Sequence, residues 1–204
     1  MSTVTLVNCG LGNIQAFAHI YQRLNIPVEV AKTADQLARA EKLILPGVGA
    51  FDWAMTRLND SGLRDTLDEL VLRQRVPVLG VCVGMQMMAH RSEEGELPGL
   101  GWIDAEVVRF DSAQIGHAPL PHMGWNDVRP TATDTLFLGI DAPRYYFLHS
   151  YCIAPRHPAD VLAIARYGSD FTAAVRNGHV FGTQFHPEKS HKWGIDLLRN
   201  FAAI

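Results

Sequence analysis

The sequence predicts an α/β fold with a central, mostly parallel sheet flanked by helices and an additional β-rich segment. In the first half of the chain, short apolar runs alternate with segments whose apolar residues recur at helical spacing, the pattern of strand–helix units. The run at residues 76–81 is almost entirely apolar, as expected of a strand buried on both faces of a parallel sheet. Residues 102–186 contain β-rich runs separated by turns with Gly, Pro or Asn.

The predicted elements of the first half follow one another in regular order. Strands are predicted at residues 4–7, 28–30, 42–45 and 76–81. Helices are predicted between them, from the spacing of apolar residues, at residues 14–24, 34–40 and most of 50–73. Because sites in doubly wound folds lie at the carboxyl ends of strands, the candidate site loops are residues 8–13, 46–51 and 80–86.

The second half is dominated by predicted strands, followed by one closing helix. The strands are predicted at residues 105–110, 145–153, 161–165, 171–176 and 180–186. The helix is predicted at residues 193–203, where apolar residues again recur at helical spacing. No internal repeat, low-complexity tract or linker interrupts the chain, so we expect one domain over residues 1–204.

The composition excludes several classes of protein. The chain has 204 residues, of which 48% are hydrophobic and 19% charged, with a formal net charge of −3. These values do not fit a disordered chain, and no basic excess indicates nucleic-acid binding. No apolar run approaches the roughly 20 residues of a membrane-spanning helix. The first residues lack the pattern of a secretory signal, so we expect a cytoplasmic protein.

The three cysteines indicate neither a disulfide framework nor a zinc centre. Cys9, Cys82 and Cys152 are widely spaced, odd in number and without a CxxC pair. We therefore expect no metal and no cofactor, and we ask whether one of the thiols carries chemistry.

Cys82 lies in a pattern typical of a nucleophile elbow. The sequence Gly80-Val81-Cys82-Val83-Gly84 directly follows the apolar run at residues 76–81 and precedes a predicted helix. Flanking glycines allow the sharp turn that exposes a nucleophile between strand and helix. A thiol with an ordinary pKa of about 8.5 is only a few per cent ionised at neutral pH, so a helix N-terminus or a nearby imidazolium is useful there. The alternative is a buried, inert cysteine, which the glycine bracket argues against.

His186 is the candidate general base for a Cys82 nucleophile. It ends the predicted strand at residues 180–186 and is followed by Pro187-Glu188. Residues two apart on an extended chain point the same way, so Glu188 is placed to orient the imidazole, which gives nucleophile, base and carboxylate. His-x-Glu alone fits a surface pair equally well, and His149 remains a rival base.

Pro46-Gly47-Val48-Gly49 is a candidate oxyanion loop. It follows the predicted strand at residues 42–45, where a glycine-rich turn presents backbone N–H groups to a developing negative charge. Together with the N–H of Val83 it would stabilise an oxyanion. An ordinary tight turn explains the same residues if Cys82 is not a nucleophile.

Two other patterns are weak. Gly10-Leu11-Gly12 is similar to the start of a dinucleotide fingerprint, but Gln15 stands at the third glycine position. His186, Glu188 and His191 have neither HExxH nor Cys–His spacing, so a metal site is disfavoured.

Taken together, these motifs resemble the class I (triad) glutamine amidotransferases. The resemblance rests on the loop at residues 46–49, the elbow at residues 80–86 and Gln184-Phe185-His186-Pro187-Glu188, with further matching stretches over nearly the whole chain in the family's order. It implies the flavodoxin-like amidotransferase fold. Within the family, the chain is most similar to the glutaminase subunits of imidazole glycerol phosphate synthase.

The resemblance implies a role for each site residue. Cys82 would attack the side-chain amide of L-glutamine, and His186, oriented by Glu188, would shuttle the proton to the leaving ammonia. Backbone N–H groups at Val48 and Val83 would hold the oxyanion. The residues implied to bind glutamine are Gly49, Gln86, Glu94, Ser150 and Tyr151.

The resemblance also implies a partner. Ammonia would pass to the cyclase subunit, a (β/α)₈ barrel, which forms imidazole glycerol phosphate and the purine intermediate AICAR in L-histidine biosynthesis, and the two subunits would form a heterodimer. We expect the partner to dock on the loop at residues 121–126, which combines an aromatic with polar groups.

Some stretches leave the pathway open. Residues 97–102 and 190–194 are similar to a paralogous subgroup that supplies ammonia for amidino sugars of surface polysaccharides, and Cys9 stands where many family members carry Tyr. Two alternatives outside this reaction are a non-catalytic binding module on the same fold and a cysteine hydrolase acting on another substrate. The intact Cys82, His186 and Glu188 argue against the first, and Gln86 with Glu94 against the second.

Overall fold

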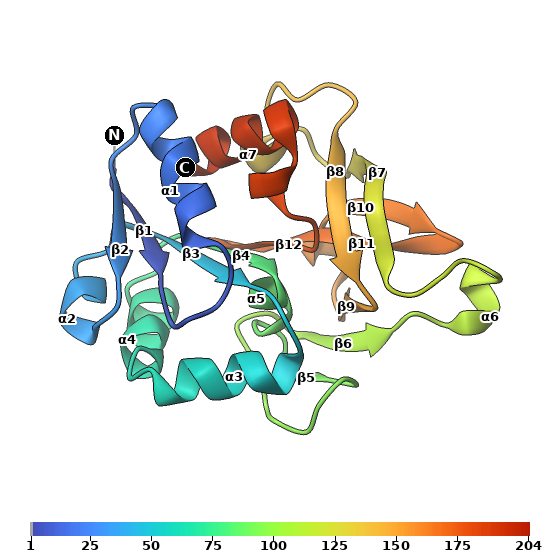
Figure 1. The fold of residues 1–204 in the computed structure, drawn as a ribbon, viewed down its shortest axis with the longest axis horizontal. Helices are drawn as coiled ribbons and strands as arrows, with labels where there is room; N and C mark the ends of the chain where they lie inside the picture. Colours follow the sequence, from blue (N-terminus) through green and yellow to red (C-terminus); the bar gives the residue numbers. More distant parts are fainter. Residues whose placement is uncertain (1) are drawn as a thin grey trace.

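The centre of the molecule is a sheet of nine strands (Figure 1), in a computed structural model that describes residues 2–204. The strand order is β2-β1-β3-β4-β12-β11-β10-β7-β8. The first five of these pair in parallel and comprise β1 (Val4–Val7), β2 (Val28–Ala31), β3 (Lys42–Gly47), β4 (Val78–Cys82) and β12 (Val180–Thr183). They are short and largely buried, in keeping with a sheet that is covered on both faces.

The other half of the sheet is antiparallel. It consists of β11 (Ser169–Asn177), β10 (Val161–Tyr167), β7 (His122–Pro130) and β8 (Arg144–His149). The sheet is therefore less parallel than the sequence indicated, because most of the additional β-rich segment continues the central sheet. A separate three-stranded sheet holds β5 (Arg91–Ser92), β6 (Ala105–Arg109) and β9 (Tyr151–Pro155).

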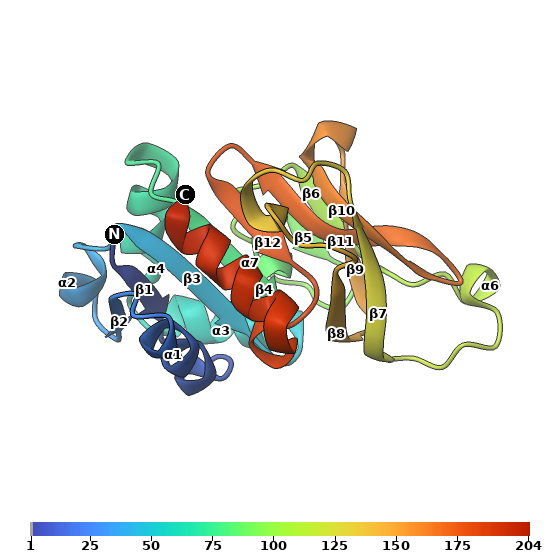
Figure 2. The same cartoon turned by 90° about the horizontal axis from the view of Figure 1, so that it is seen from above.

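Helices cover both faces of the parallel half (Figures 1 and 2). Helices α1 (Ile14–Arg23) and α7 (His191–Ala203) lie on one face, and α3 (Phe51–Asp60) and α4 (Arg64–Asp68) lie on the other. The shorter helices are α2 (Ala34–Leu37), α5 (Val83–Gln86) and α6 (Ser112–Ile115), with a π-helical turn at Glu69–Arg73 and 3₁₀ turns at Thr135–Phe137, Pro158–Asp160 and Pro187–Lys189. No helix among residues 2–204 has both the length and the apolar character needed to cross a membrane.

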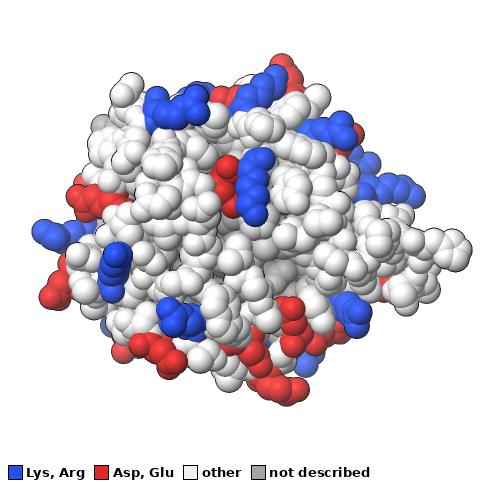
Figure 3. Space-filling model, in the orientation of Figure 1, with Lys and Arg blue, Asp and Glu red and all other residues white. Residues whose placement is uncertain are grey.

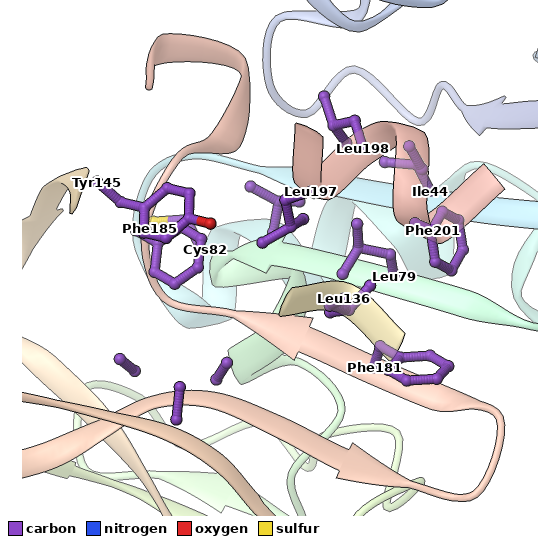
Figure 4. Close-up of a cluster of buried hydrophobic side chains, with 14 of the residues drawn as sticks. Ile44, Leu79, Cys82, Leu136, Tyr145, Phe181, Phe185, Leu197, Leu198 and Phe201 are labelled. Carbon is purple, nitrogen blue, oxygen red and sulfur yellow. The ribbon is translucent and has the colours of Figure 1, made fainter. Parts of the chain in front are cut away.

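The core beneath α7 is a cluster of buried apolar side chains. Figure 4 shows Leu197, Leu198 and Phe201 of α7 packed over residues of the central strands. Beside them, the rings of Tyr145 and Phe185 stack with centroids 3.9 Å apart. Cys82 lies at the edge of this same cluster, so the predicted nucleophile stands on a rigid apolar base.

Three sequence predictions need correction. The expected docking loop at residues 121–126 is mostly strand β7, which escaped detection because its inward residues include the polar His122 and Asn126. The run at residues 145–153 is two strands that separate at Ser150 and enter different sheets. Strand β12 ends at Thr183, so His186 lies beyond the ladder, where its N–H donates to the Tyr146 carbonyl at 2.9 Å.

The elbow after β4 depends on backbones that touch. A Cβ atom on Gly84 would overlap the carbonyl oxygen of Leu45, and one on Gly80 would lie 2.7 Å from the carbonyl oxygen of Gly84. Each of these positions therefore requires glycine, because α5 is pressed directly onto β3 and β4.

Replacing Gly84 by Ala should destabilise the protein by about 3 kcal/mol or more, since the new methyl group meets main chain that has no room to move. Gly62→Ala is the matched control, because its φ is +74° but nothing lies within 4 Å of the added Cβ. The control should cost only about 1–2 kcal/mol from left-handed strain. Urea unfolding midpoints measure both variants, and equal losses would contradict the close-approach account.

Candidate active site

The candidate site lies where three adjacent parallel strands end. Strands β3, β4 and β12 are neighbours in the sheet, with Gly47 opposite Cys82 and Thr183 opposite Val81. Their carboxyl ends deliver the loop at residues 46–49, the elbow and His186 to one edge, as expected for a doubly wound fold.

Cys82 has a backbone conformation that few non-glycine residues adopt. Its φ is +57° and its ψ is −116°, and such strain at a strand–helix turn is typical of a nucleophile elbow. The following helix α5 has only four residues, so the expected helix-dipole effect on the thiol is small. The charge partner of Cys82 is instead the imidazole of His186.

His186 and Glu188 form a buried pair. Nδ1 of His186 lies 2.9 Å from Oε1 of Glu188, and the two side chains are 2% and 3% exposed. Burial disfavours the imidazolium, but hydrogen bonds with the Cys82 thiol and the Glu188 carboxylate outweigh it and raise the pKa of His186 to about 9. The arrangement thus favours a charged imidazole between a sulfur and a carboxylate, which is the electrostatic order a thiol nucleophile needs.

The rival base His149 has the opposite electrostatic character. Burial lowers its pKa to about 3, and its Nδ1 lies 2.8 Å from the carbonyl oxygen of Tyr151. Its Nε2 faces His122 at 2.9 Å rather than a carboxylate. His149 also lines the pocket described next, but no acid orients it, so His186 is the better placed base.

A cavity of about 300 Å³ opens beside Cys82. Nearly every residue expected from the sequence lies in its wall, Glu188 being the exception because it sits behind His186. The cavity is lined by Val48, Gly49, Cys82, Val83, Gln86, Glu94, Pro121, Leu148, His149, Ser150, Tyr151, His186 and Lys189. The structure therefore brings the nucleophile, the base, the candidate oxyanion loop and the candidate glutamine-binding residues into one space.

The polar residues of the wall are held by hydrogen bonds. Gln86 donates from Nε2 to the Tyr151 carbonyl at 3.1 Å and to Oε1 of Gln184 at 3.0 Å. Glu94 accepts from the backbone N–H of Phe51 at 2.9 Å, at the start of α3. Gly49, with φ of +100°, packs over the ring of Trp53.

Several residues at or next to the cavity were not assigned to the site from the sequence. Gln184 directs its Nε2 at the sulfur of Cys82, 3.8 Å away, and it was visible only as part of the motif that ends in His186. Leu148, whose carbonyl lies 3.9 Å from the Cys82 sulfur, carried no local signal, since long-range pairing brings it here. Pro121 was expected only as part of the docking loop and not as a residue of the cavity wall. Lys189 follows Glu188 directly, and its proximity to the triad was a usable signal.

The geometry does not support the two weaker sequence patterns, a metal site that includes His191 and a dinucleotide fingerprint at Gly10-Leu11-Gly12. The ring of His191 stacks on Trp125, with centroids 5.2 Å apart, rather than joining His186. Across residues 2–204, no group of three His, Cys, Asp or Glu side chains is arranged to hold a metal ion. The space above Gly10 is occupied by the guanidinium of Arg57.

The stability of the protein should report the charge on His186. Its folded pKa of about 9 exceeds the ordinary 6.5, so its contribution is fully present below pH 6.5 and is lost as the pH rises toward 9. Glu188→Gln weakens this contribution. We expect the free energy of unfolding of wild type minus that of the variant to fall by about 1–3 kcal/mol over this range.

Urea unfolding at a series of pH values, with reductant present, measures that difference. Glu29→Gln, which removes an exposed carboxylate from β2, should show no such trend. A difference that stays constant from pH 6.5 to 9 would contradict a charged His186.

Comparison with known proteins gives the family by two routes, a family model and curated relatives, and the same fold by a third. A family model described as glutamine amidotransferase class-I matches residues 5–204. Solved structures similar in fold include a glutamine amidotransferase (TM-score 0.75, 22% identity, 98% of this chain and 99% of that one) and PurLQS from Thermotoga maritima (TM-score 0.72, 17% identity, 98% of each chain).

Curated relatives match over almost the full length. The proteins named imidazole glycerol phosphate synthase subunit HisH from Bdellovibrio bacteriovorus and Leptospira borgpetersenii are 55% and 46% identical, over 98% of this chain and 100% of each relative. Subunit HisH 2 from Pseudomonas aeruginosa is 46% identical, over 98% of this chain and 99% of the relative. This chain belongs to the class I glutamine amidotransferase family.

Proposed function

We propose that this chain is the glutaminase subunit of an imidazole glycerol phosphate synthase: it hydrolyses L-glutamine to glutamate and ammonia for L-histidine biosynthesis. One observation carries the proposal, namely that Cys82, His186 and Glu188 are assembled in order at a cavity in a chain with full-length HisH relatives at 46–55% identity. We further propose a single cytoplasmic amidotransferase domain over residues 1–204.

In the first half-reaction, the Cys82 sulfur attacks the side-chain amide carbon of glutamine. The C–N bond breaks, and the imidazolium of His186 gives its proton to the leaving nitrogen, which departs as ammonia. Glu188 accepts a hydrogen bond from Nδ1 of His186, which keeps Nε2 directed at the reacting atoms. The product is a γ-glutamyl thioester on Cys82.

In the second half-reaction, water replaces ammonia. The neutral His186 removes a proton from the water, whose oxygen attacks the thioester carbon, and the C–S bond breaks to release glutamate and restore Cys82. Both steps pass through an oxyanion, for which we assign the backbone N–H groups of Val48 and Val83 as donors. Each such donor is worth roughly 2.7–4 kcal/mol of barrier.

We assign the rest of the wall to binding glutamine. Glu94 supplies a carboxylate for the α-ammonium group, and Gln86, Ser150 and Tyr151 supply amide, hydroxyl and main-chain groups for the α-amino acid end. Gly49 lies in the wall of the same cavity, with a φ of +100° that favours glycine. The cavity of about 300 Å³ is of a size for a small amino acid rather than a polymer.

We propose that a (β/α)₈ cyclase docks over the cavity and receives the ammonia in a heterodimer. Strand β7 presents Met123 and Trp125, which are 66% and 37% exposed, and Leu148 and Val48 at the cavity are 38% and 40% exposed. Exposed apolar side chains gathered near one site are typical of a protein interface. On the face shown in Figure 3, most charged side chains lie toward the outline, and one pair of opposite charge lies near the centre of an otherwise uncharged surface.

A paralogous partner that makes amidino sugars would use the same half-reaction. The catalytic triad is the same in both pathways, so the two are distinguished by the partner that receives the ammonia. Histidine genes beside the locus, rather than sugar-nucleotide genes, are expected under our proposal.

Glutamate release in the presence and absence of a ligand-loaded cyclase subunit tests the function. We expect stimulated turnover that falls about a thousandfold or more in Cys82→Ala and His186→Ala, because each removes a member of the reacting unit. His149→Ala should retain a kcat within about tenfold of wild type. Turnover that survives Cys82→Ala, or a larger kcat loss from His149→Ala than from His186→Ala, would overturn the mechanism.

Trp125→Ala should weaken binding of the cyclase subunit. An exposed aromatic at the centre of an interface contributes about 2 kcal/mol or more, so we expect the Kd to rise about 30-fold by calorimetric titration. Leu72→Ala removes a side chain that is 56% exposed but lies away from the cavity, and its Kd should stay within twofold. Equal Kd values for the two variants would place the interface elsewhere.

A further inference from the structure

A buried chain of hydrogen bonds joins strand β7 to the wall of the glutamine cavity. Asn126 lies with its Nδ2 3.3 Å from Nε2 of His122. Nδ1 of His122 is 2.9 Å from Nε2 of His149, and Nδ1 of His149 is 2.8 Å from the carbonyl oxygen of Tyr151. The glutaminase mechanism gives no role to His122 or Asn126.

The partners at the two ends fix the direction of every bond in this chain. A carbonyl oxygen only accepts, so Nδ1 of His149 carries the proton and its Nε2, in the neutral ring, is bare. That bare nitrogen accepts from Nδ1 of His122, whose own Nε2 then accepts from the amide of Asn126. The second amide hydrogen of Asn126 goes to the carbonyl of Arg166 at 2.8 Å. Each ring nitrogen of His122 and His149 therefore has one partner and one role, donor or acceptor.

The surroundings hold both rings neutral and in place. His122 and His149 are 3% and 6% exposed, and burial lowers their pKa values to about 4 and about 3. The ring of His122 is stacked between Phe147 and Tyr167, with centroids 4.9 and 4.1 Å away. Neither ring therefore gains a proton near neutral pH, and the order of bonds persists.

The chain of hydrogen bonds ends at the carbonyl of Tyr151, a residue of the cavity wall. The Tyr151 carbonyl accepts from His149 and also from Nε2 of Gln86, so two side chains of the wall converge on one oxygen. Ser150 and Tyr151 form the bend where strands β8 and β9 part into different sheets. Main-chain pairing with β6 holds one side of this bend, because Tyr151 lies opposite Arg109 and the Ser150 carbonyl accepts from the N–H of Phe110 at 3.2 Å. The hydrogen bond from His149 ties Tyr151 to the end of β8.

We propose that His122 is a positioning residue for the glutamine cavity: by donating to His149 it fixes the main chain at Ser150 and Tyr151, against which the α-amino acid end of glutamine binds. The proposal rests on the glutaminase function above. His122 and Asn126 point inward from β7, while Met123 and Trp125 point outward from the same strand. Strand β7, which we assign to docking of the partner, therefore also contains a residue, His122, that supports the wall of the glutamine cavity.

Two variants at residue 122 separate positioning from packing. His122→Phe keeps an aromatic ring between Phe147 and Tyr167 but leaves Nε2 of His149 without a donor. His122→Asn gives up the stacking but places an amide N–H where Nδ1 was. A packing role predicts that Phe is the milder change, whereas a positioning role predicts that Asn is.

In the stimulated complex, we expect His122→Phe to raise the KM for glutamine by about 5- to 100-fold, the range that an unsatisfied buried acceptor produces. The kcat should change less than about threefold, and His122→Asn should return KM to within about threefold of wild type. A KM for His122→Phe equal to that of wild type, or a lower KM for Phe than for Asn, overturns the proposal.

A second measurement needs no partner. The diazoketone analogue of glutamine labels Cys82 only after binding in the cavity, whereas iodoacetamide labels it without using the glutamine wall. We expect His122→Phe to slow the first reaction at least about fivefold and the second less than twofold. If wild-type Cys82 is not labelled by the diazoketone, the proposed glutaminase function fails. If wild type and His122→Phe are labelled equally, only the role of His122 fails.

The tautomers themselves are observable in protein labelled with ¹⁵N-histidine. At pH 7 we expect His122 and His149 both to show a protonated Nδ1 and a bare Nε2, with no titration between pH 6 and 8. A protonated Nε2 on either ring breaks the directed chain and overturns the proposal.

Discussion

The contact of α5 with the backbones of β3 and β4 is the constraint on which the site depends. Gly84 sits against the Leu45 carbonyl and Gly80 against Gly84, so the chain must turn within one residue, and Cys82 takes the strained φ of +57°. That turn directs the thiol toward His186 instead of into the sheet. The apolar cluster around Phe185 and Tyr145 supports it from below, so the strain at the nucleophile is held by packing at some distance from the chemistry.

Two histidines at this cavity, His186 and His149, have opposite charge states. His186 meets a sulfur and a carboxylate, and its pKa rises to about 9. His149 has no carboxylate partner, so burial dominates and its pKa falls to about 3. Both are almost fully buried, and the difference arises because only His186 has Cys82 and Glu188 to outweigh the effect of burial. The charged histidine suits proton transfer and the neutral one suits holding a wall in place.

The sequence predicted those parts of the site that are formed by residues close together in the chain. The elbow around Cys82 and the pair of His186 and Glu188 each consist of residues close together in the chain. The parallel strands that precede them, β4 and β12, are short, fully buried runs. Strand β7 was missed because it buries a histidine and an asparagine, so it lacks the apolar alternation that identifies strands. The contacts of Gln184 and His122 join residues 102 and 27 positions apart, and no local pattern encodes such pairings.

Direct observation of the covalent intermediate tests the central claim, that the elbow makes Cys82 the nucleophile. Rapid acid quenching of the cyclase-bound chain with glutamine, followed by peptide mass spectrometry, samples the first turnover. The account predicts a γ-glutamyl thioester on the peptide that contains Cys82, formed before glutamate appears. A γ-glutamyl group on Cys9 or Cys152, or glutamate formed with no adduct at any time in the first turnover, would contradict it.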